Sequence, residues 1–438
     1  MRYELKGTKV LVAGMAKSGF AAVEVLLKHG AEVRAIDANP TEEMRSRLVQ
    51  FGVELGPQTP EAFAGAGLIV LSPGVPVEVV PPGAAPVIGE LELASYDLQG
   101  PSIGVTGSNG KTTTTALIGH ILEWSGIRCQ VGGNIGTPPA AMIASSCPDQ
   151  WNVLELSSFQ LETIQEFRAK VALVLNITQN HLDRHVTIEN YTNAKARLLE
   201  TQDESCCAIL NRDNSITASL AARTRGEVVW FSMKGPVERG LWLQSNEIVG
   251  TSGALMSIGD IRLRGMHNVE NVMAAAAAAQ IAGASLEQIR AAVMTFQGVE
   301  HRIEFVRRLD GVDYYNDSKA TSVDAALKAI DAFPGGLWIV LGGKDKGSDY
   351  TVMREPLRRK AKAALLIGAA SPKIAKHLEG AVELVECGDI SRAVQVGRER
   401  ATAGDTVLLA PACASFDQFR SFEHRGDTFK EIVRGLKG

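Results

Sequence analysis

Short apolar runs that alternate with longer helical stretches constrain the fold of this chain more than any other feature. Parallel strands have this form, because helices cover both faces of the sheet they build. A chain of 438 residues exceeds one compact core, so we expect two or three domains. The predicted strands lie at 10–13, 33–36, 68–71, from 103, near 153, and at 171–175, 208–210, 312–315, 337–341, 364–367 and 407–409.

Changes in this pattern divide the chain into three predicted domains. A stretch rich in proline and glycine at 72–89 interrupts the first series of strands. Residues 228–263 have short alternating runs between Gly and Ser turns, which are typical of antiparallel strands. A helix is expected at about 268–281. We predict an α/β protein with domains at 1–95, 96–298 and 299–438.

Composition and charge exclude several classes of partner. The net charge is −4, which gives no electrostatic reason to expect nucleic acid or an anionic membrane as a partner. No stretch approaches the roughly 20 apolar residues that span a bilayer, and the N-terminus lacks the pattern of a signal peptide. The six cysteines have no CxxC spacing, so we expect reduced core residues rather than disulfides or a zinc site. A cytoplasmic protein is the natural prediction.

The strongest local signal is the sequence GVTGSNGKTT at residues 104–113, where an apolar strand leads through a glycine-rich turn into a helix. Backbone N–H groups in such a turn, together with the helix N-terminus, bind phosphate. The Lys111 ammonium would contact the terminal phosphates, and the Thr112 hydroxyl would reach a magnesium ion. Val105 stands where a standard P-loop has its first glycine, and a plain glycine turn is the alternative. Because strand, loop, Lys-Thr pair and helix occur together, we predict nucleotide phosphate binding.

A second glycine loop, at 14–19, follows the first predicted strand, and Asp37 ends the next strand. The pattern imitates a dinucleotide fingerprint without its middle glycine, although Lys17 could contact a phosphate instead. Taken alone, the loop fits a nucleotide-sugar or dinucleotide site and a plain β–α turn equally. An NAD-dependent dehydrogenase is therefore an alternative, but it leaves the Lys111 loop and Glu155 unexplained.

Candidate magnesium ligands follow two predicted strands near the phosphate loop. Glu155 ends one apolar strand, and His181 and Asp183 follow another. Magnesium needs hard ligands beside phosphate oxygens, and the strand ends of α/β sheets are where such sites form. Isolated groups in these places are often helix caps or surface groups. Lys195 would by default be a solvated helix lysine.

Polar residues of the second and third predicted domains form a further candidate set. Asn268 and Asn271 lie one turn apart at a helix start, where Asn268 could be an N-cap or both amides could contact a purine and its phosphates. Arg302 suits a transferring phosphate, and the lysines of loops 316–321 and 342–346 suit an anionic substrate. Each charge alone could be solvated. Together they predict a site shared between two domains.

In order and spacing, these segments resemble the Mur ligase family, whose members add amino acids to the peptide of the peptidoglycan precursor. The resemblance covers about residues 5–435 and rests on GVTGSNGKTT, ELSSFQL, NITQNHLDRH, GMHNVEN, EHR, NDSKAT, LGGKDKG and PACASFDQF. Residues 72–75, 316–321 and 411–426 resemble the branch that adds D-glutamate to UDP-N-acetylmuramoyl-L-alanine. Other members usually carry a DYAH-type segment where this chain has NDSKAT.

The resemblance implies a Rossmann-like N-terminal domain for the UDP substrate, a central P-loop-type ATPase domain and a Rossmann-like C-terminal domain for the amino acid. It implies a monomeric ATP-dependent ligase of cytoplasmic peptidoglycan precursor synthesis that forms an acyl-phosphate intermediate. The implied cofactors are ATP, two Mg²⁺ ions and a carbamylated lysine at Lys195.

The resemblance also implies individual roles. Implied catalytic residues are Lys111, Glu155, His181, Lys195 and Arg302, and implied metal ligands are Thr112, Glu155, His181 and carbamylated Lys195. ATP is expected at Gly107, Ser108, Asn109, Gly110, Lys111, Thr112, Thr113, Asn268, Asn271, Arg302 and Asp317. The UDP substrate is expected at Ser72, Gly74 and Asn134, and D-glutamate at Thr321, Lys346, Ser415 and Phe422.

Two further functions use the same sequence features. A folate-glutamylating ligase or a different Mur step would share the scaffold, but a DYAH-like segment would favour it and the chain has none. A non-catalytic nucleotide-binding switch would need only the phosphate loop. Such a switch would bind ATP without releasing phosphate in response to a carboxylate and an amine.

Overall fold

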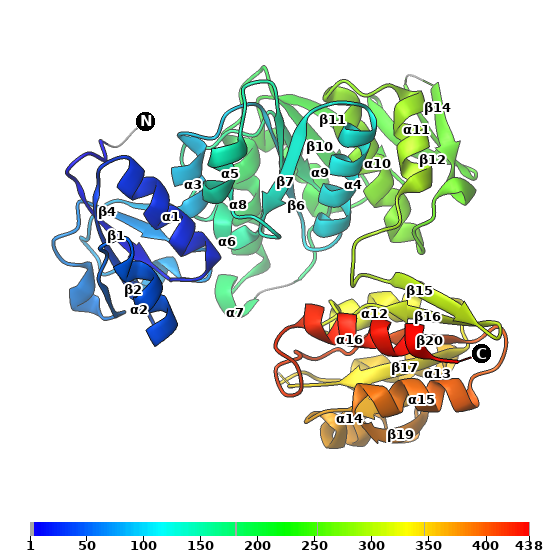
Figure 1. Cartoon of the computed structure of the whole chain (residues 1–438). Helices are drawn as coiled ribbons and strands as arrows, with labels where there is room; N and C mark the ends of the chain where they lie inside the picture. Colours follow the sequence, from blue (N-terminus) through cyan, green and yellow to red (C-terminus); the bar gives the residue numbers. More distant parts are fainter. Residues whose placement is uncertain (1–3, 180–181, 252, 346, 438) are drawn as a thin grey trace. The chain divides into compact units, whose positions relative to one another are not determined.

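The structure is a computed structural model that describes residues 4–179, 182–251, 253–345 and 347–437. These residues form three sheets and two compact units (Figure 1). The first unit comprises Met1–Ile261 with Val269–Phe296, and the second comprises Arg262–Asn268 with Gln297–Gly438. We describe each unit by itself. The predicted boundaries near 95 and 298 stay predictions.

The N-terminal sheet of the first unit is wholly parallel, in the order β3-β2-β1-β4-β5. Its elements are β1 Lys9–Ala13, α1 Lys17–Lys28, β2 Glu32–Asp37, α2 Glu42–Val49, β3 Leu55–Pro57, β4 Leu68–Leu71, β5 Val87–Gly89 and α3 Glu90–Ser95. Helices α1 and α2 pack on one face, and the 75–87 segment covers the other. The order reverses between β1 and β4, so the loops that follow these strands border a crevice.

The central sheet of the same unit has the order β14-β13-β12-β11-β10-β9-β6-β8-β7. Its strands are β6 Ser102–Thr106, β7 Cys129–Gly133, β8 Trp151–Glu155, β9 Val171–Val174, β10 Cys207–Asn211, β11 Glu227–Ser232, β12 Gly240–Gln244, β13 Glu247–Gly250 and β14 Gly253–Ser257. Its helices are α4 Lys111–Trp124, α5 Pro139–Met142, α6 Ser158–Leu161, α7 Leu182–His185, α8 Ile188–Glu200, α9 Ser215–Ser219, α10 Met266–Ile281 and α11 Leu286–Thr295. Helices α5, α6 and α8 share one apolar core with this sheet, while α4 packs on β7 and β8 and against α11.

The prediction of antiparallel strands across 228–263 is partly wrong. Strand β11 pairs in parallel with β10 and β12, and only β12, β13 and β14 pair antiparallel. Val229 and Phe231 are buried in β11 and alternate with partly exposed neighbours, so the prediction of a strand here is confirmed. Alternation shows which face of a strand is buried, but the connection to the preceding strand sets its direction. Here the chain passes from β10 through α9 before it enters β11, which allows the two strands to be parallel.

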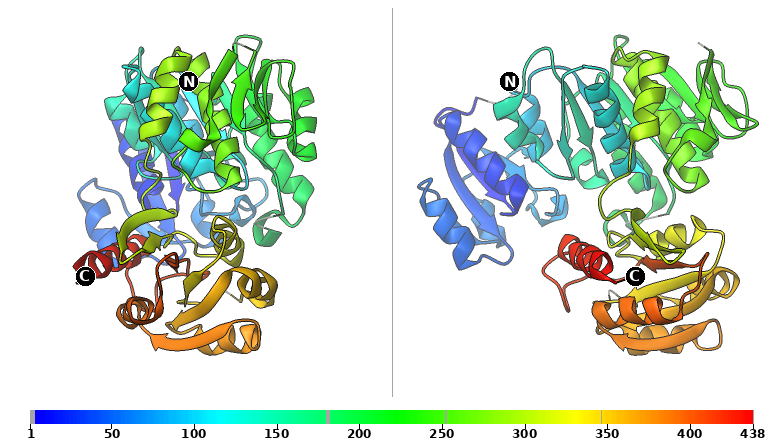
Figure 2. Two further views of the ribbon diagram at one scale, coloured as in Figure 1. Left: turned by 90° about the vertical axis from the view of Figure 1, so that its right-hand side faces the viewer. Right: turned by 45° about the vertical axis from the view of Figure 1, so that its right-hand side comes forward.

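The second unit has a six-stranded sheet in the order β15-β16-β20-β17-β18-β19. Its elements are β15 Glu304–Leu309, β16 Val312–Asn316, α12 Val323–Asp331, β17 Leu337–Gly342, α13 Arg354–Lys360, β18 Ala361–Ile367, α14 Ser371–Leu378, β19 Glu383–Gly388, α15 Ile390–Arg400, β20 Thr406–Leu409 and α16 Phe422–Gly435. Helices α12, α13 and α14 pack on one face and α15 and α16 on the other (Figure 2). Because β16, β17 and β20 are parallel, the loops that follow them meet at one edge.

The predicted α/β class and the predicted strands are confirmed in this fold. No helix in the described part of the chain is both long and apolar enough to span a bilayer. The cysteines are free thiols, and only Cys206 and Cys413 are fully buried. The expectation that all six are core residues is therefore wrong for the four half-buried ones.

Candidate active site

The glycine-rich turn between β6 and α4 forms a tight loop around the side chain of its own lysine. Gly107 and Gly110 have φ angles of +150° and +85°, and Gly110 directly precedes α4. Lys111 Nζ donates to the carbonyls of Gly107 and Ser108 at 2.8 and 3.2 Å. Two loop N–H groups donate to the backbone and side-chain oxygens of Asn176, at 2.8 and 2.9 Å. A cationic loop at the N-terminus of a 14-residue helix is suited to phosphate.

Asn271 of α10 supports this loop from a second helix. Its Oδ1 accepts a hydrogen bond from Thr114 Oγ1 at 3.3 Å. A Cβ on Gly110 would lie 2.3 Å from the same Oδ1, so the close approach requires glycine. Thr112 and Thr113 occupy the first turn of α4 beside this contact. The structure thus brings Asn271 to the phosphate loop.

Asn268 does not cap α10, so the N-cap interpretation is wrong. The helix begins at Met266, after Gly265 with φ +91°, and Asn268 lies inside its first turn. The Asn268 Nδ2 donates backward to the Arg264 carbonyl at 2.6 Å, whereas an N-cap side chain accepts from the helix. Asn268 belongs to the second unit and Asn271 to the first.

Glu155 ends β8 as a buried carboxylate with one oxygen unpaired. Its exposed fraction is 2%. Oε1 accepts from Asn134 Nδ2 at 2.9 Å, whereas Oε2 is buried and has no hydrogen-bond partner among the described residues. Leaving a buried carboxylate oxygen unsatisfied is costly. The oxygen is therefore chemically suited to a hard cation such as Mg²⁺.

Lys195 is buried rather than solvated, which corrects the default interpretation of a helix lysine. Its exposed fraction is 1%, its Nζ donates to Thr106 Oγ1 at 3.2 Å, and it lies 4.6 Å from the Tyr191 ring centroid. Burial and the positive charge of Lys111 lower the pKa of Lys195 well below its usual value, against the opposing charge of Glu155. These effects shift the Lys195 amine towards its neutral form.

A cavity of about 480 Å³ lies where the loops after β1 and β4 meet the central sheet. Ser72 Oγ donates to the Gly14 carbonyl at 2.6 Å, which joins the two loops. Asp37 also lines the cavity, and its carboxylate accepts from the Met15 N–H at 2.7 Å. The predicted UDP-substrate residues all line this cavity, namely Ser72, Gly74 and Asn134.

Asn134 connects this cavity to the phosphate-loop region. The same side chain lines the cavity and donates to Glu155. The wall of the cavity is therefore joined to the candidate metal ligand by one hydrogen bond.

In the second unit, Asp317 is a buried acid at the strand edge. Burial raises its pKa to about 6, against the opposing positive charge of Arg302. Its Oδ1 has no hydrogen-bond partner among the described residues. An unpaired buried acceptor at a strand end suits the hydroxyl or amine donors of a ligand.

The loops predicted to hold the amino acid are joined by one buried arginine. Arg425 of α16 is 1% exposed. Its Nε donates to Ser318 Oγ at 2.9 Å, and its Nη groups donate to the Ser318 carbonyl at 2.9 Å and the Cys413 carbonyl at 3.2 and 3.3 Å. Burial lowers the pKa of Arg425 to about 10. The predicted residues on these joined segments are Thr321, Ser415 and Phe422.

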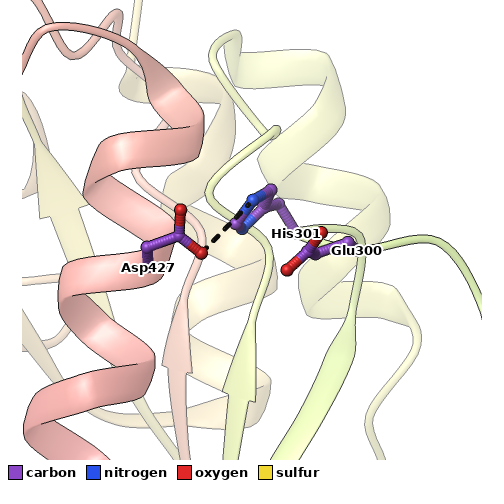
Figure 3. Close-up of side chains that lie close together, drawn as sticks. All are labelled: Glu300, His301 and Asp427. Carbon is purple, nitrogen blue, oxygen red and sulfur yellow. Dashed lines mark ion pairs between the residues drawn. The ribbon is translucent and has the colours of Figure 1, made fainter. Parts of the chain in front are cut away.

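Glu300, His301 and Asp427 also cluster in the second unit, with candidate ligand atoms within 4.8 Å of one another (Figure 3). The ammonium of Lys430 is placed among the acids. It pairs with Glu300, with Asp427 at 3.1 Å and with Glu304 at 3.5 Å. A cation of the chain therefore already neutralises these carboxylates, and we assign the cluster to stabilisation of this unit.

Two predicted site residues, His181 and Lys346, lie outside the described residues. The sequence reasoning missed Gln160 and Arg425. Gln160 lines the cavity and forms a capping box with Ser157 at the start of α6, so its motif looked structural. Arg425 lies in a helix, where an arginine usually faces solvent, and no sequence signal marked it as buried.

The fold and the glycine loop define an α/β protein with a P-loop-type nucleotide-binding domain. Family comparisons match the Mur ligase MurD-like N-terminal domain at residues 8–82, the Mur ligase middle domain at 105–279 and the Mur ligase glutamate ligase domain at 301–413. The chain belongs to the Mur ligase family.

Individual proteins agree with this assignment. A UDP-N-acetylmuramoylalanine–D-glutamate ligase of Solibacter usitatus is 57% identical over 99% of both chains. The ligase of the same name from Acidobacterium capsulatum is 47% identical over 99% of this chain and 98% of that protein. The solved UDP-N-acetylmuramate-alanine ligase of Thermotoga maritima matches with a TM-score of 0.63 at 17% identity, over 98% of this chain and 100% of that one, and shows the shared fold.

Proposed function

We propose that the chain is an ATP-dependent ligase that joins D-glutamate to UDP-N-acetylmuramoyl-L-alanine in the cytoplasm, as a monomer. The names of the relatives support this proposal along the whole chain. The observation that carries it is the hydrogen bond from Asn134 to Glu155. It joins a substrate-sized cavity to the phosphate-loop region, as a reaction between a substrate carboxylate and ATP requires.

The proposed reaction has two steps. In the first, a terminal carboxylate oxygen of the UDP-linked substrate attacks the γ-phosphorus of ATP, and ADP leaves. In the second, the D-glutamate amine attacks the acyl carbon, loses a proton, and expels inorganic phosphate. Lys111 and Arg302 would stabilise charge on the transferring group. No covalent bond to the protein is needed.

Magnesium would be held by Thr112, Glu155, His181 and Lys195 in its carbamylated form, with two ions in the complete site. The unpaired Oε2 of Glu155 fits this assignment. The metal would reduce repulsion between the anionic carboxylate and the triphosphate.

Carbamylation of Lys195 fits the environment of its amine. Carbon dioxide reacts with a neutral amine and releases a proton, and the lowered pKa of Lys195 favours that neutral form. The product is an anion that would be attracted by Lys111 and by magnesium, whereas an ammonium would repel both.

ATP is assigned to the phosphate loop with Asn271, and to Asn268, Arg302 and Asp317 of the second unit. D-glutamate is assigned to Thr321, Lys346, Ser415 and Phe422. The Arg425 hydrogen bonds that join their segments support a preformed amino-acid site.

The test is phosphate release from ATP and magnesium with UDP-N-acetylmuramoyl-L-alanine and either D-glutamate, L-glutamate or no amino acid. Release that requires both the UDP substrate and D-glutamate is the expected result. Release with a different acceptor, or independent of both substrates, would contradict the proposed reaction while leaving the nucleotide site intact.

A further inference from the structure

Arg184, near the end of α7, contacts the wall of the substrate cavity from the side of the central sheet. Its Nη2 donates to the Val75 carbonyl at 3.3 Å and to Glu162 Oε2 at 2.7 Å. The guanidinium also lies 4.9 Å from the centroid of the Phe159 ring. One side chain thus joins the loop after β4 to the segments around α6 and α7.

The partners of Arg184 are themselves fixed. Glu162 Oε1 lies 3.3 Å from His185 Nδ1, and His185 Nε2 is 2.9 Å from Ser158 Oγ. The Arg184 and Glu162 side chains are only 12% and 19% exposed. Because this ion pair is largely shielded from water, it is held more strongly than a surface pair.

The cavity loop 72–75 is consequently restrained on two sides. On the side of the N-terminal sheet, Ser72 Oγ donates to the Gly14 carbonyl. On the side of the central sheet, the restraint is the Arg184 bond to Val75. Ser72, Gly74 and Val75 line the cavity, whereas Arg184 does not. Loss of Arg184 would therefore change the cavity wall without removing a group that lines it.

We propose that Arg184 is a positioning residue that couples the UDP-substrate loop to the chain segment following His181, the predicted metal ligand. This inference rests on the proposed function, because it takes the cavity as the UDP-substrate site. Arg184 holds the Val75 carbonyl, so loop 72–75 is already arranged when the UDP substrate binds, and substrate contact with the loop stabilises the Arg184 contacts. The coupling is reciprocal, so the contacts of Arg184 also favour substrate binding.

The first experiment measures binding of UDP-N-acetylmuramoyl-L-alanine to the full chain by calorimetry, without ATP or D-glutamate. We expect Arg184→Ala to weaken binding about tenfold or more, equivalent to about 1.4 kcal/mol. Arg184→Lys should recover part of the affinity, because it restores a cation without the planar group over Phe159. Arg168→Ala is the matched control, since Arg168 also pairs with an acid, Asp203, and donates to the carbonyl of Thr201 at 3.0 Å.

Steady-state kinetics separate positioning from a general structural role. Arg184→Ala should raise the KM of the UDP substrate and the magnesium concentration for half-maximal rate, with little change in the KM of D-glutamate. Glu162→Gln, which keeps an acceptor oxygen but loses the charge, should change the same two quantities less. It also tests the inference if Arg184→Ala does not fold.

The outcomes distinguish this inference from the proposed function. If the unmodified protein does not bind the UDP substrate, the proposed function fails. If it binds but Arg184→Ala binds equally well, the coupling by Arg184 is refuted. An equal loss for all three substrates together with a lower melting temperature would also refute it, because that pattern describes a purely structural ion pair.

Discussion

Replacement of Gly110 by alanine tests whether the phosphate loop depends on close contact with α10. Gly110 has φ +85°, where a residue with a Cβ is disfavoured by about 1–2 kcal/mol. Its new Cβ would lie 2.3 Å from Asn271 Oδ1, so Asn271 would have to move and lose its bond with Thr114. Loss of that hydrogen bond adds about 0.5–1.5 kcal/mol. We expect Gly110→Ala to destabilise the first unit by about 1.5–3.5 kcal/mol.

The same helix offers a matched control for backbone strain. Gly126, just after the C-terminal end of α4, has φ +72°, and a Cβ there would meet nothing within 4 Å. Gly126→Ala should therefore cost only the strain, about 1–2 kcal/mol. If Gly110→Ala lowers the free energy of unfolding more than Gly126→Ala does, the difference measures the cost of displacing Asn271.

The assay combines urea denaturation of both variants with the KM for ATP. We expect Gly110→Ala to unfold at lower urea than Gly126→Ala and to raise the KM for ATP at least tenfold, whereas Gly126→Ala leaves that KM unchanged. Equal stabilities and equal ATP constants would refute the inference that the loop requires this contact with Asn271.

Three further predictions concern single side chains. Glu155→Gln should lower kcat by about 100-fold or more and raise the magnesium requirement, because it removes the charge that suits a hard cation; an unchanged magnesium titration would contradict this role. Burial raises the pKa of Asp317 to about 6 in the fold, so wild-type stability should fall as pH rises from about 4 to 6 and then level off. That fall should amount to up to about 3 kcal/mol, and Asp317→Asn should remove it while weakening ATP binding. If the melting temperature changes equally between pH 4.5 and 7.5 in both proteins, this role of Asp317 is ruled out. Arg425→Lys should destabilise the second unit by about 2–4 kcal/mol, because it leaves buried acceptors unpaired, and should raise the KM of D-glutamate more than that of ATP; equal effects on the two constants would argue against a preformed amino-acid site.

Strand positions and the phosphate loop could be predicted because their signals are local. The apolar run at 68–71 is buried on both faces, and a buried parallel strand leaves little choice of residue type. At Gly110, the turn before the helix needs left-handed backbone, and a glycine at that position is the usual sequence sign of such backbone. The pairing direction of β11 was not visible, because it depends on the path of the chain between strands.

Burial of charged residues was the main feature that the sequence could not reveal. Lys195 and Arg425 lie in helices whose sequences would also suit a solvated face. Their burial depends on residues far away in the sequence, including Thr106 for Lys195 and Ser318 for Arg425. Only the family resemblance assigned a role to Lys195, and nothing did so for Arg425.

The electrostatics of the first unit explain why the site would bind its ligands together. Lys111 is satisfied by two carbonyls of its own loop, so an incoming phosphate must replace those bonds. Lys195 is driven towards the neutral form by burial and by Lys111, while Glu155 keeps one oxygen unpaired. A carbamate on Lys195 would replace a poorly stabilised ammonium, and a metal ion would satisfy the unpaired oxygen of Glu155 and attract both the carbamate and the nucleotide phosphates. We therefore infer that their binding is cooperative, and that the UDP substrate joins this linkage through Asn134, the residue that reaches both Glu155 and the cavity.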